Sequence, residues 1–201
     1  MGLFARSKPA PLVGLFGKIP VRGDFVAMSL PRDFQGRLEI WIKTGIAIAQ
    51  NTPGWHEAYM SSPVWQFAFA RGFLDDTPWC GIIMPSVDSV GRNFPLIIAA
   101  RAPAARSDVL MKAQTLAQET LSADFADVEG WMLRVRELAG SDIETGPDRL
   151  CAPDSGAQIR VVEPSGLVRA ALREHEVAPG LYSRMIGSNG NPASSDEVPL
   201  L

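Results

Sequence analysis

The sequence has few of the residues that build metal centres or covalent cross-links. Its 201 residues include two cysteines and two histidines. Cys80 and Cys151 form no CxxC pair, and His56 and His175 each lack a second ligand at zinc spacing. We therefore predict two free thiols, no metal site and no cofactor. We also predict no catalytic residue, because neither histidine has a visible link to a nucleophile.

Long apolar runs and a large excess of charge of one sign are also missing. The longest strongly apolar stretches, 81–84 and 96–100, are far shorter than the roughly 20 residues needed to cross a bilayer. The 19 basic and 22 acidic side chains give a net charge of −3 and are spread along the chain. Neither nucleic acid nor an anionic membrane is therefore an expected partner. Since no apolar run of secretory type follows Arg6 and Lys8, we expect a cytoplasmic protein without membrane insertion.

The composition that remains is that of a packed domain. Apolar residues make up 46% of the chain and charged residues 20%, which is a globular balance. The length lies near the upper range for one compact domain, and no internal repeat is present. We predict a single domain over residues 1–187. The segment 188–201 is rich in Ser, Asn, Gly and Pro, so we predict a flexible tail there.

Apolar periodicity predicts the helices and strands. Steps of three and four residues predict helices over about 31–50, 108–121 and 124–140. A further helix is expected over about 167–176, and short elements over about 55–59 and 179–186. Ser107 or Asp108 is the expected N-cap of the second long helix. Alternation and short apolar runs predict strands over about 12–18, 64–70, 79–84, 94–100 and 159–162.

Three of these strands follow one another closely, which favours an antiparallel meander. The long helices each carry one apolar face, and these faces need a sheet to cover. The predicted fold class is therefore α/β of the α+β kind, a mainly antiparallel central sheet flanked by helices.

Three familiar motifs are approached but not matched. Gly14 to Lys18 resembles a phosphate-binding loop, but Leu12 occupies the expected first glycine position and Ile19 supplies no hydroxyl for magnesium. We interpret this segment as the end of a strand. The tripeptide 22–24 is an Arg-Gly-Asp sequence, which in a chain without a secretion signal is better interpreted as a turn. Ser86 lacks the GxSxG pattern of a hydrolase nucleophile.

The most informative segment is the polar interruption between two apolar strands, residues 85–95. Ser86 and Asp88 are expected to accept hydrogen bonds from backbone N–H groups, and Gly91 to take a positive φ. Arg92 presents a fork that grips a carboxylate or carbonyl oxygens. A loop that fixes strand register and a loop that binds a partner both fit this chemistry.

Two segments together resemble the TagF family, which is associated with type VI secretion. They are GKIPVRGDF at residues 17–25 and MPSVDSVGRNFP at residues 84–95. Further positions between them fit the family pattern, namely Trp41, Trp55, residues 62–67 and Gly72. The resemblance covers roughly the first half of the chain and fades beyond Arg101. There, residues 165–167 replace a tryptophan-containing strand expected from the family.

The resemblance implies a small cytoplasmic α/β factor associated with post-translational repression of secretion-system assembly. It implies binding, with the forkhead-associated scaffold protein of the system as the expected partner. The leading hypothesis is an interaction module whose two motif loops meet at one end of the sheet. Its partner-binding or loop-ordering residues would be Lys18, Arg22, Asp24, Ser86, Asp88 and Arg92.

Two other functions stay open. The first is a small-molecule-binding or enzymatic α/β domain whose pocket is lined by Asp24, Asp88 and Arg92, with one of the carboxylates as acid or base. The second is a purely structural subunit, for which a large obligate interface is expected. The oligomeric state is left open by the sequence.

Overall fold

The centre of the fold is a seven-stranded sheet. The computed structural model describes residues 12–140, 143–163, 168–174 and 180–187. Within these residues the strand order is β2-β1-β5-β4-β3-β8-β9, and every pairing is antiparallel. The strands are β1 Val13–Gly17, β2 Val26–Met28, β3 Trp65–Phe69, β4 Trp79–Met84, β5 Leu96–Ala100, β8 Ala157–Val162 and β9 Val168–Glu174. The predicted antiparallel sheet is confirmed, including the meander of β3, β4 and β5.

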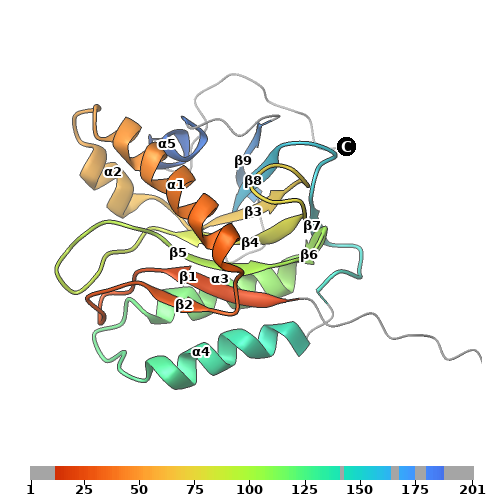
Figure 1. Ribbon diagram of the computed structural model, residues 1–201, viewed down its shortest axis with the longest axis horizontal. Helices are drawn as coiled ribbons and strands as arrows, with labels where there is room; N and C mark the ends of the chain where they lie inside the picture. Colours follow the sequence, from red (N-terminus) through yellow and green to blue (C-terminus); the bar gives the residue numbers. More distant parts are fainter. Residues whose placement is uncertain (1–11, 141–142, 164–167, 175–179, 188–201) are drawn as a thin grey trace, which may run out of the picture.

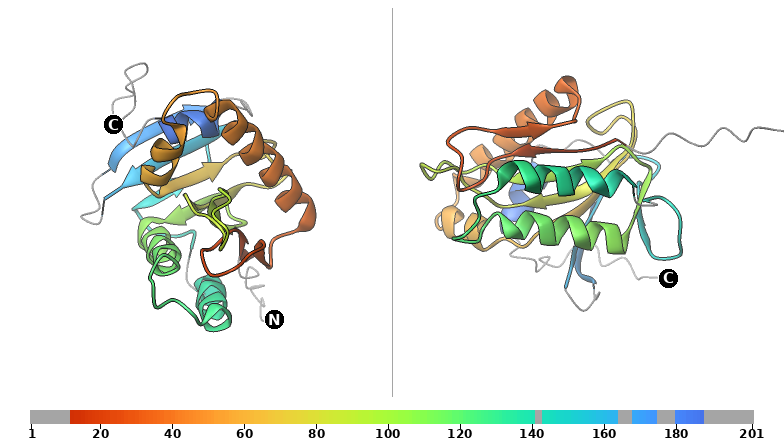
Figure 2. Two further views of the ribbon diagram at one scale, coloured as in Figure 1. Left: turned by 90° about the vertical axis from the view of Figure 1, so that its left-hand side faces the viewer. Right: turned by 90° about the horizontal axis from the view of Figure 1, so that it is seen from below.

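Helices cover both faces of this sheet (Figures 1 and 2). One face carries α1 Arg32–Ala49, α2 Trp55–Ser61 and α5 Gly180–Gly187. The other carries α3 Ser107–Glu119 and α4 Val128–Glu137, which ends in the short 3₁₀ helix η1 Leu138–Gly140. A separate two-stranded ribbon pairs β6 Ala104–Arg106 with β7 Arg149–Cys151. The α+β fold class is thus confirmed, and it has three layers.

The three layers explain the burial of the central strands. Alternate side chains of a strand point to opposite faces, so β3 sends Phe67 and Phe69 into the core under α1 and Ala68 into the core under α3. The sequence pattern placed the aromatic residues on one face correctly. Both faces are covered, however, and all five residues of β3 are buried.

Two sequence predictions differ from the structure, and a third lies outside the described residues. The helix expected over 167–176 is the strand β9, because this segment pairs with β8 from Val168 to Glu174, and long-range pairing overrides a weak local propensity. Neither Ser107 nor Asp108 caps α3, since Arg106 holds the cap position and its guanidinium binds the Asp108 carboxylate. The predicted tail over 188–201 lies outside the described residues, and the single domain over 1–187 stays a prediction.

Two further sequence predictions concern the cysteines and membrane-spanning helices. Cys80 is buried and Cys151 is exposed at the end of β7, and both are free, as predicted. Among the described helices none is long and apolar enough to span a bilayer. Apolar side chains pack between the sheet and the helices on both of its faces.

The buried aromatic residues generate the first prediction. Trp41, Phe67 and Phe69 are at most 4% exposed, and the Trp41 ring meets the edge of Phe69 at 5.7 Å between centroids. Replacing any of them with alanine should lower the free energy of unfolding by about 3–5 kcal/mol, because a cavity is left behind. Chemical denaturation measures this. Ile40→Ala is the control on the same helix; its side chain is 69% exposed, so its loss should cost less than about 0.5 kcal/mol. Equal effects of Ile40→Ala and Trp41→Ala would contradict the packing described here.

Candidate functional site

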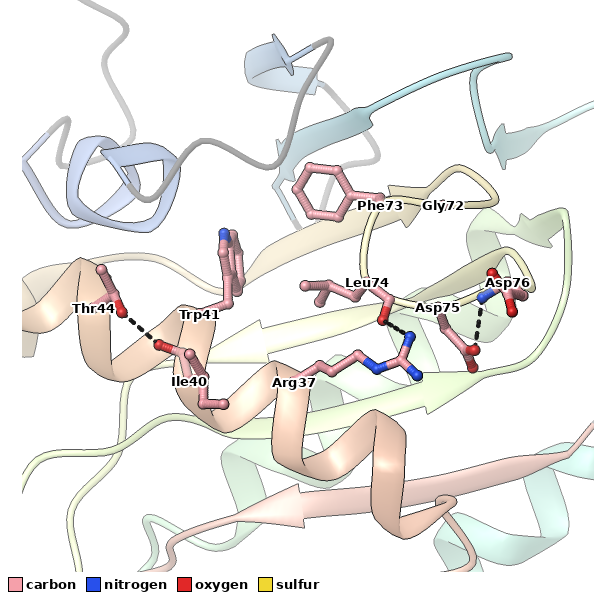
Figure 3. A pocket seen from close by; sticks show the side chains of 9 residues that line it. All are labelled: Arg37, Ile40, Trp41, Thr44, Gly72, Phe73, Leu74, Asp75 and Asp76. Atoms are coloured by element: carbon pink, nitrogen blue, oxygen red, sulfur yellow. Dashed lines mark hydrogen bonds between the residues drawn. The ribbon is translucent and has the colours of Figure 1, made fainter.

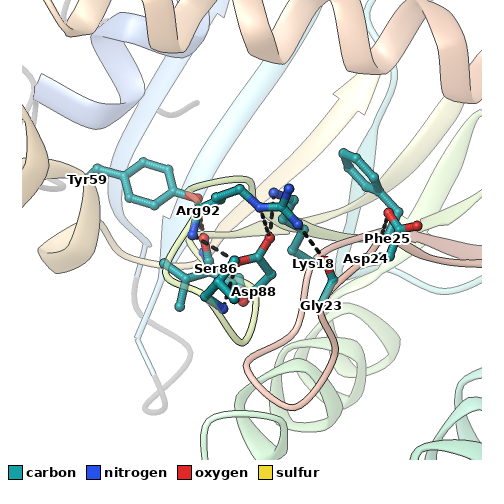
Figure 4. Close-up of polar contacts among 10 residues, drawn as sticks. Lys18, Gly23, Asp24, Phe25, Tyr59, Ser86, Asp88 and Arg92 are labelled. Carbon is teal, nitrogen blue, oxygen red and sulfur yellow. Dashed lines mark hydrogen bonds and ion pairs between the residues drawn. The ribbon is translucent and has the colours of Figure 1, made fainter.

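The two motif loops meet at one end of the sheet, where they form what we call the paired-loop surface, residues 18–25 and 85–95 (Figure 4). The first loop follows β1 and the second precedes β5, and these strands are antiparallel neighbours. Gly17 has φ of 145°, and a Cβ atom there would lie 2.1 Å from the Pro95 carbonyl oxygen. Only glycine allows this approach. Across the loops, the Ser89 N–H donates to the Arg22 carbonyl oxygen at 2.9 Å.

Asp88 is the centre of the contacts between the two loops. Its side chain is 0% exposed, and each carboxylate oxygen accepts two contacts. Oδ1 accepts from the backbone N–H groups of Val90 and Arg92 at 3.1 and 2.9 Å. Oδ2 accepts from Arg92 Nε at 2.6 Å and from Lys18 Nζ at 2.9 Å. Gly91 takes the predicted positive φ, at 81°, which lets the loop turn back on this carboxylate.

These contacts also decide the protonation state of Asp88. Burial by itself would raise the pKa of the carboxyl, because a buried charge loses hydration. The hydrogen bonds from Lys18 and from the backbone and side chain of Arg92 outweigh burial and hold the pKa well below its usual range. Asp88 is therefore a fixed anion at neutral pH, which does not suit an acid or a base in catalysis.

Lys18 is the cation that joins the end of β1 to the second loop. It is almost fully buried, and besides its ion pair with Asp88 its Nζ lies 5.4 Å from the centroid of the Phe25 ring. The Phe25 ring in turn stacks on Phe16 at 5.0 Å and meets Phe94 edge-on at 4.8 Å. The ammonium group thus lies over Phe25, which belongs to an aromatic cluster from β1 and both loops.

The remaining predicted residues lie at the surface of the loops. Arg92 has a side chain that is 62% exposed, yet its Nη2 donates to the Gly23 carbonyl oxygen at 2.5 Å. Arg22 pairs with Glu129 of α4 at 2.9 Å. The exposed carboxylate of Asp24 accepts from the N–H of Phe25 at 2.7 Å. Five of the six predicted residues therefore tie the loops together or frame their surface.

Ser86, the sixth, orders its loop through its backbone rather than through the hydroxyl. The sequence predicted that the hydroxyl accepts a backbone N–H bond, but the bond it makes among the described residues is donated to the Val87 carbonyl oxygen at 3.5 Å. Its backbone binds Tyr59 of α2 instead: the Tyr59 hydroxyl donates to the Ser86 carbonyl oxygen at 2.8 Å and accepts from its N–H at 3.1 Å. Burial raises the pKa of Tyr59 well above its ordinary value, although the Ser86 bond acts in the other direction. Tyr59 could not be placed at this site from the sequence, because no short-range pattern links it to residue 86.

Two cavities are formed by described residues, and neither is lined by the residues of the alternative pocket, Asp24, Asp88 and Arg92. The cavity of about 390 Å³ formed by described residues lies between α1 and the segment that joins β3 to β4 (Figure 3). Asp24, Asp88 and Arg92 do not line it. Within the described part of the chain, no group of three or more metal-ligating side chains comes together. The paired-loop surface is thus a pair of loops ordered by hydrogen bonds and an ion pair between them.

The fold and the site define a small α+β protein with a rigid, two-loop surface at one end of its sheet. The family described as TagF N-terminal domain, type VI secretion system-associated, matches residues 14–147, so the chain belongs to the TagF family. This match extends past Arg101, further than the resemblance seen in the sequence.

Solved structures support the fold across nearly the whole chain. The crystal structure of PA0076 from Pseudomonas aeruginosa PAO1 is similar to this protein with a TM-score of 0.74 and 25% identity. The alignment covers 94% of this chain and 98% of that one. No curated protein sequence matches. The described architecture is therefore shared by an experimentally solved protein.

The depressed pKa of Asp88 generates the second prediction. A carboxyl whose pKa is lower in the folded than in the unfolded chain stabilises the fold at pH values above its unfolded pKa of about 4. This stabilisation is lost as the pH falls below about 4. Asp88→Asn should lower the melting midpoint at neutral pH and flatten the loss of midpoint below about pH 4. Asp24→Asn is the matched control, since it changes an exposed carboxylate in the facing loop. A wild-type melting profile for Asp88→Asn would show that the network does not order the loops.

Proposed function

We propose that this protein is a non-enzymatic, cytoplasmic regulator of a type VI secretion system. In this proposal it represses assembly post-translationally by binding the forkhead-associated scaffold component of the system. Membership in the TagF family supports the connection with type VI secretion. The scaffold partner and the direction of regulation are what the two motif segments imply by their resemblance.

The observation that carries the binding role is the pair of exposed valines on the paired-loop surface. Val21 is 42% exposed and Val90 is 70% exposed, and they stand next to Arg22 and Ser89, which are hydrogen bonded to each other. Apolar side chains held on a pre-ordered backbone lose little conformational entropy on binding. They suit the apolar centre of a protein interface.

Charged residues lie close to these valines in the sequence of the two loops. Arg22, Asp24 and Arg92 are all exposed, and they provide both signs of charge at the rim. A polar rim around a small apolar centre is the usual anatomy of a protein interface. Rim charges mainly set the association rate and the choice of partner.

The same geometry supports binding over turnover. Asp88 is saturated with donors, and Asp24 is exposed and contacts only the neighbouring backbone among the bonds described. A general acid or base needs an adjustable pKa and a substrate within reach. Neither carboxylate meets both conditions, so the proposal assigns no catalytic residue.

The third prediction concerns the two valines. Val21→Asp and Val90→Asp should each weaken binding of the purified scaffold protein at least about tenfold, because a charge is placed in a desolvated centre. Titration calorimetry measures the dissociation constant. Ile48→Asp is the control, since Ile48 is 41% exposed, as Val21 is, but lies near the end of α1. Equal weakening by all three variants, or by none, would count against this surface as the interface.

The fourth prediction separates the two roles of Arg92. Arg92→Ala removes a donor from Asp88 and from the Gly23 carbonyl, so the melting midpoint should fall by about 2–4 °C. It should also weaken scaffold binding by more than this loss of stability explains, as is typical of an interfacial arginine. Melting and titration of the same preparation give both values. A folded Arg92→Ala protein that binds at full strength would remove the 85–95 loop from the interface.

A further inference from the structure

A second feature of the molecule, the cavity between α1 and the 71–76 segment, has no part in the proposed interface (Figure 3). Its volume of about 390 Å³ lies within the usual range for small-molecule sites. Its lining comes from one helix and one loop, namely Arg37, Ile40, Trp41, Thr44, Gly72, Phe73, Leu74, Asp75 and Asp76.

The cavity and the paired-loop surface lie at opposite ends of β4. The 71–76 segment precedes this strand and the 85–95 loop follows it. A strand of six residues is roughly 20 Å long, so a ligand in the cavity would not touch the paired-loop surface. The function of one can therefore be tested without the other.

The walls of the cavity are apolar and well ordered. Phe73 and Leu74 are buried, and the Phe73 ring lies 6.0 Å from the Trp41 ring in an edge-on arrangement. Gly72 has φ of 84°, and its N–H donates to the Asp75 carbonyl oxygen at 2.7 Å, which closes a tight turn. Ile40, 69% exposed, adds apolar surface at the mouth. This environment suits a hydrocarbon body.

The charged groups lie together at one end of the cavity, and they are not equivalent. Arg37 donates through Nη1 to the Leu74 carbonyl oxygen at 3.1 Å, and within the described residues no carboxylate forms an ion pair with it. Most of its N–H groups are thus left for a ligand. Asp76 is exposed to solvent at the rim, where salt screens its charge.

The other carboxylate, Asp75, is already occupied. Its Oδ1 accepts from the Asp76 N–H at 2.7 Å, and its Oδ2 accepts from Thr77 and from Trp79 Nε1 at 3.2 and 3.1 Å. Burial would raise the pKa of Asp75, but these hydrogen bonds and the charge of Arg37 outweigh it and lower the pKa. Asp75 is a structural anion, which leaves Arg37 as the group that can recognise a ligand.

We propose that this cavity binds a small aliphatic carboxylate. The hydrocarbon chain lies among Ile40, Trp41 and Phe73, and the carboxylate accepts hydrogen bonds from the Arg37 guanidinium. A guanidinium fork matches a carboxylate in shape as well as charge. An ammonium head group would meet the positive charge of Arg37, while Asp75 is already hydrogen bonded and the charge of the exposed Asp76 is screened by solvent. A hydroxyl would use only one of the Arg37 donors.

A series of ligands with one chain length and three head groups tests this. Octanoate, octanol and octylammonium are titrated into the full-length protein, and ¹H–¹⁵N spectra are followed at the Trp41 indole N–H. This group has no hydrogen-bond partner in the described structure. Octanoate should bind most tightly and shift this signal. Hexanoate should bind about fifteenfold more weakly, since it lacks two methylenes and each buried methylene contributes a factor of about four.

Variants assign the head-group contact. Arg37→Gln should weaken octanoate binding at least tenfold, so that octanoate no longer binds more tightly than octanol. Asp76→Asn should strengthen octanoate binding by about twofold, because an anion at the rim is removed. Arg32→Gln is the control, an exposed arginine on the same helix outside the cavity. Octylammonium or octanol binding as tightly as octanoate, an unmoved Trp41 signal, or full binding by Arg37→Gln would each overturn the proposal. None of these results depends on the scaffold partner.

Discussion

A buried carboxylate that must be paired is the constraint around which this molecule is arranged. Asp88 has no exposed surface, and a buried charge without partners is strongly unfavourable. Its partners come from two places in the sequence: Arg92 from its own loop, and Lys18 from the end of β1. The ion pair with Lys18 therefore forms only when the two loops lie together. Loop order and strand pairing are in this way parts of one cooperative unit.

Several neighbouring features make that unit possible. Gly17 lets β1 pass within contact of Pro95, and Tyr59 of α2 binds both backbone groups of Ser86. One contact comes from the sheet and the other from the helical layer above it. The loop from 85 to 95 is consequently held from two sides, and its exposed residues stand on a base that belongs to the core.

The spacing of apolar residues predicted most helices and strands correctly. The features that it missed depend on contacts between residues distant in the sequence. The three-to-four residue spacing of Phe34, Leu38 and Trp41 correctly indicated α1, since these residues face the sheet. The strand β9 was mistaken for a helix because its identity depends on pairing with β8. The carboxylate and guanidinium of the 85–95 loop were recognised from residue type. Tyr59 and the Arg37 cavity were not, because both are created by elements distant in sequence.

The strand β4 has a mechanical consequence for the molecule. It is hydrogen bonded to β3 on one side and β5 on the other, and all six of its residues are buried. A strand held in this way neither stretches nor twists alone, since a close-packed interior is nearly incompressible. The cavity and the 85–95 loop are therefore joined by a single, rigidly held strand, with one at each end of β4. A shift of β4 along its own axis would therefore have to move β3 and β5 with it.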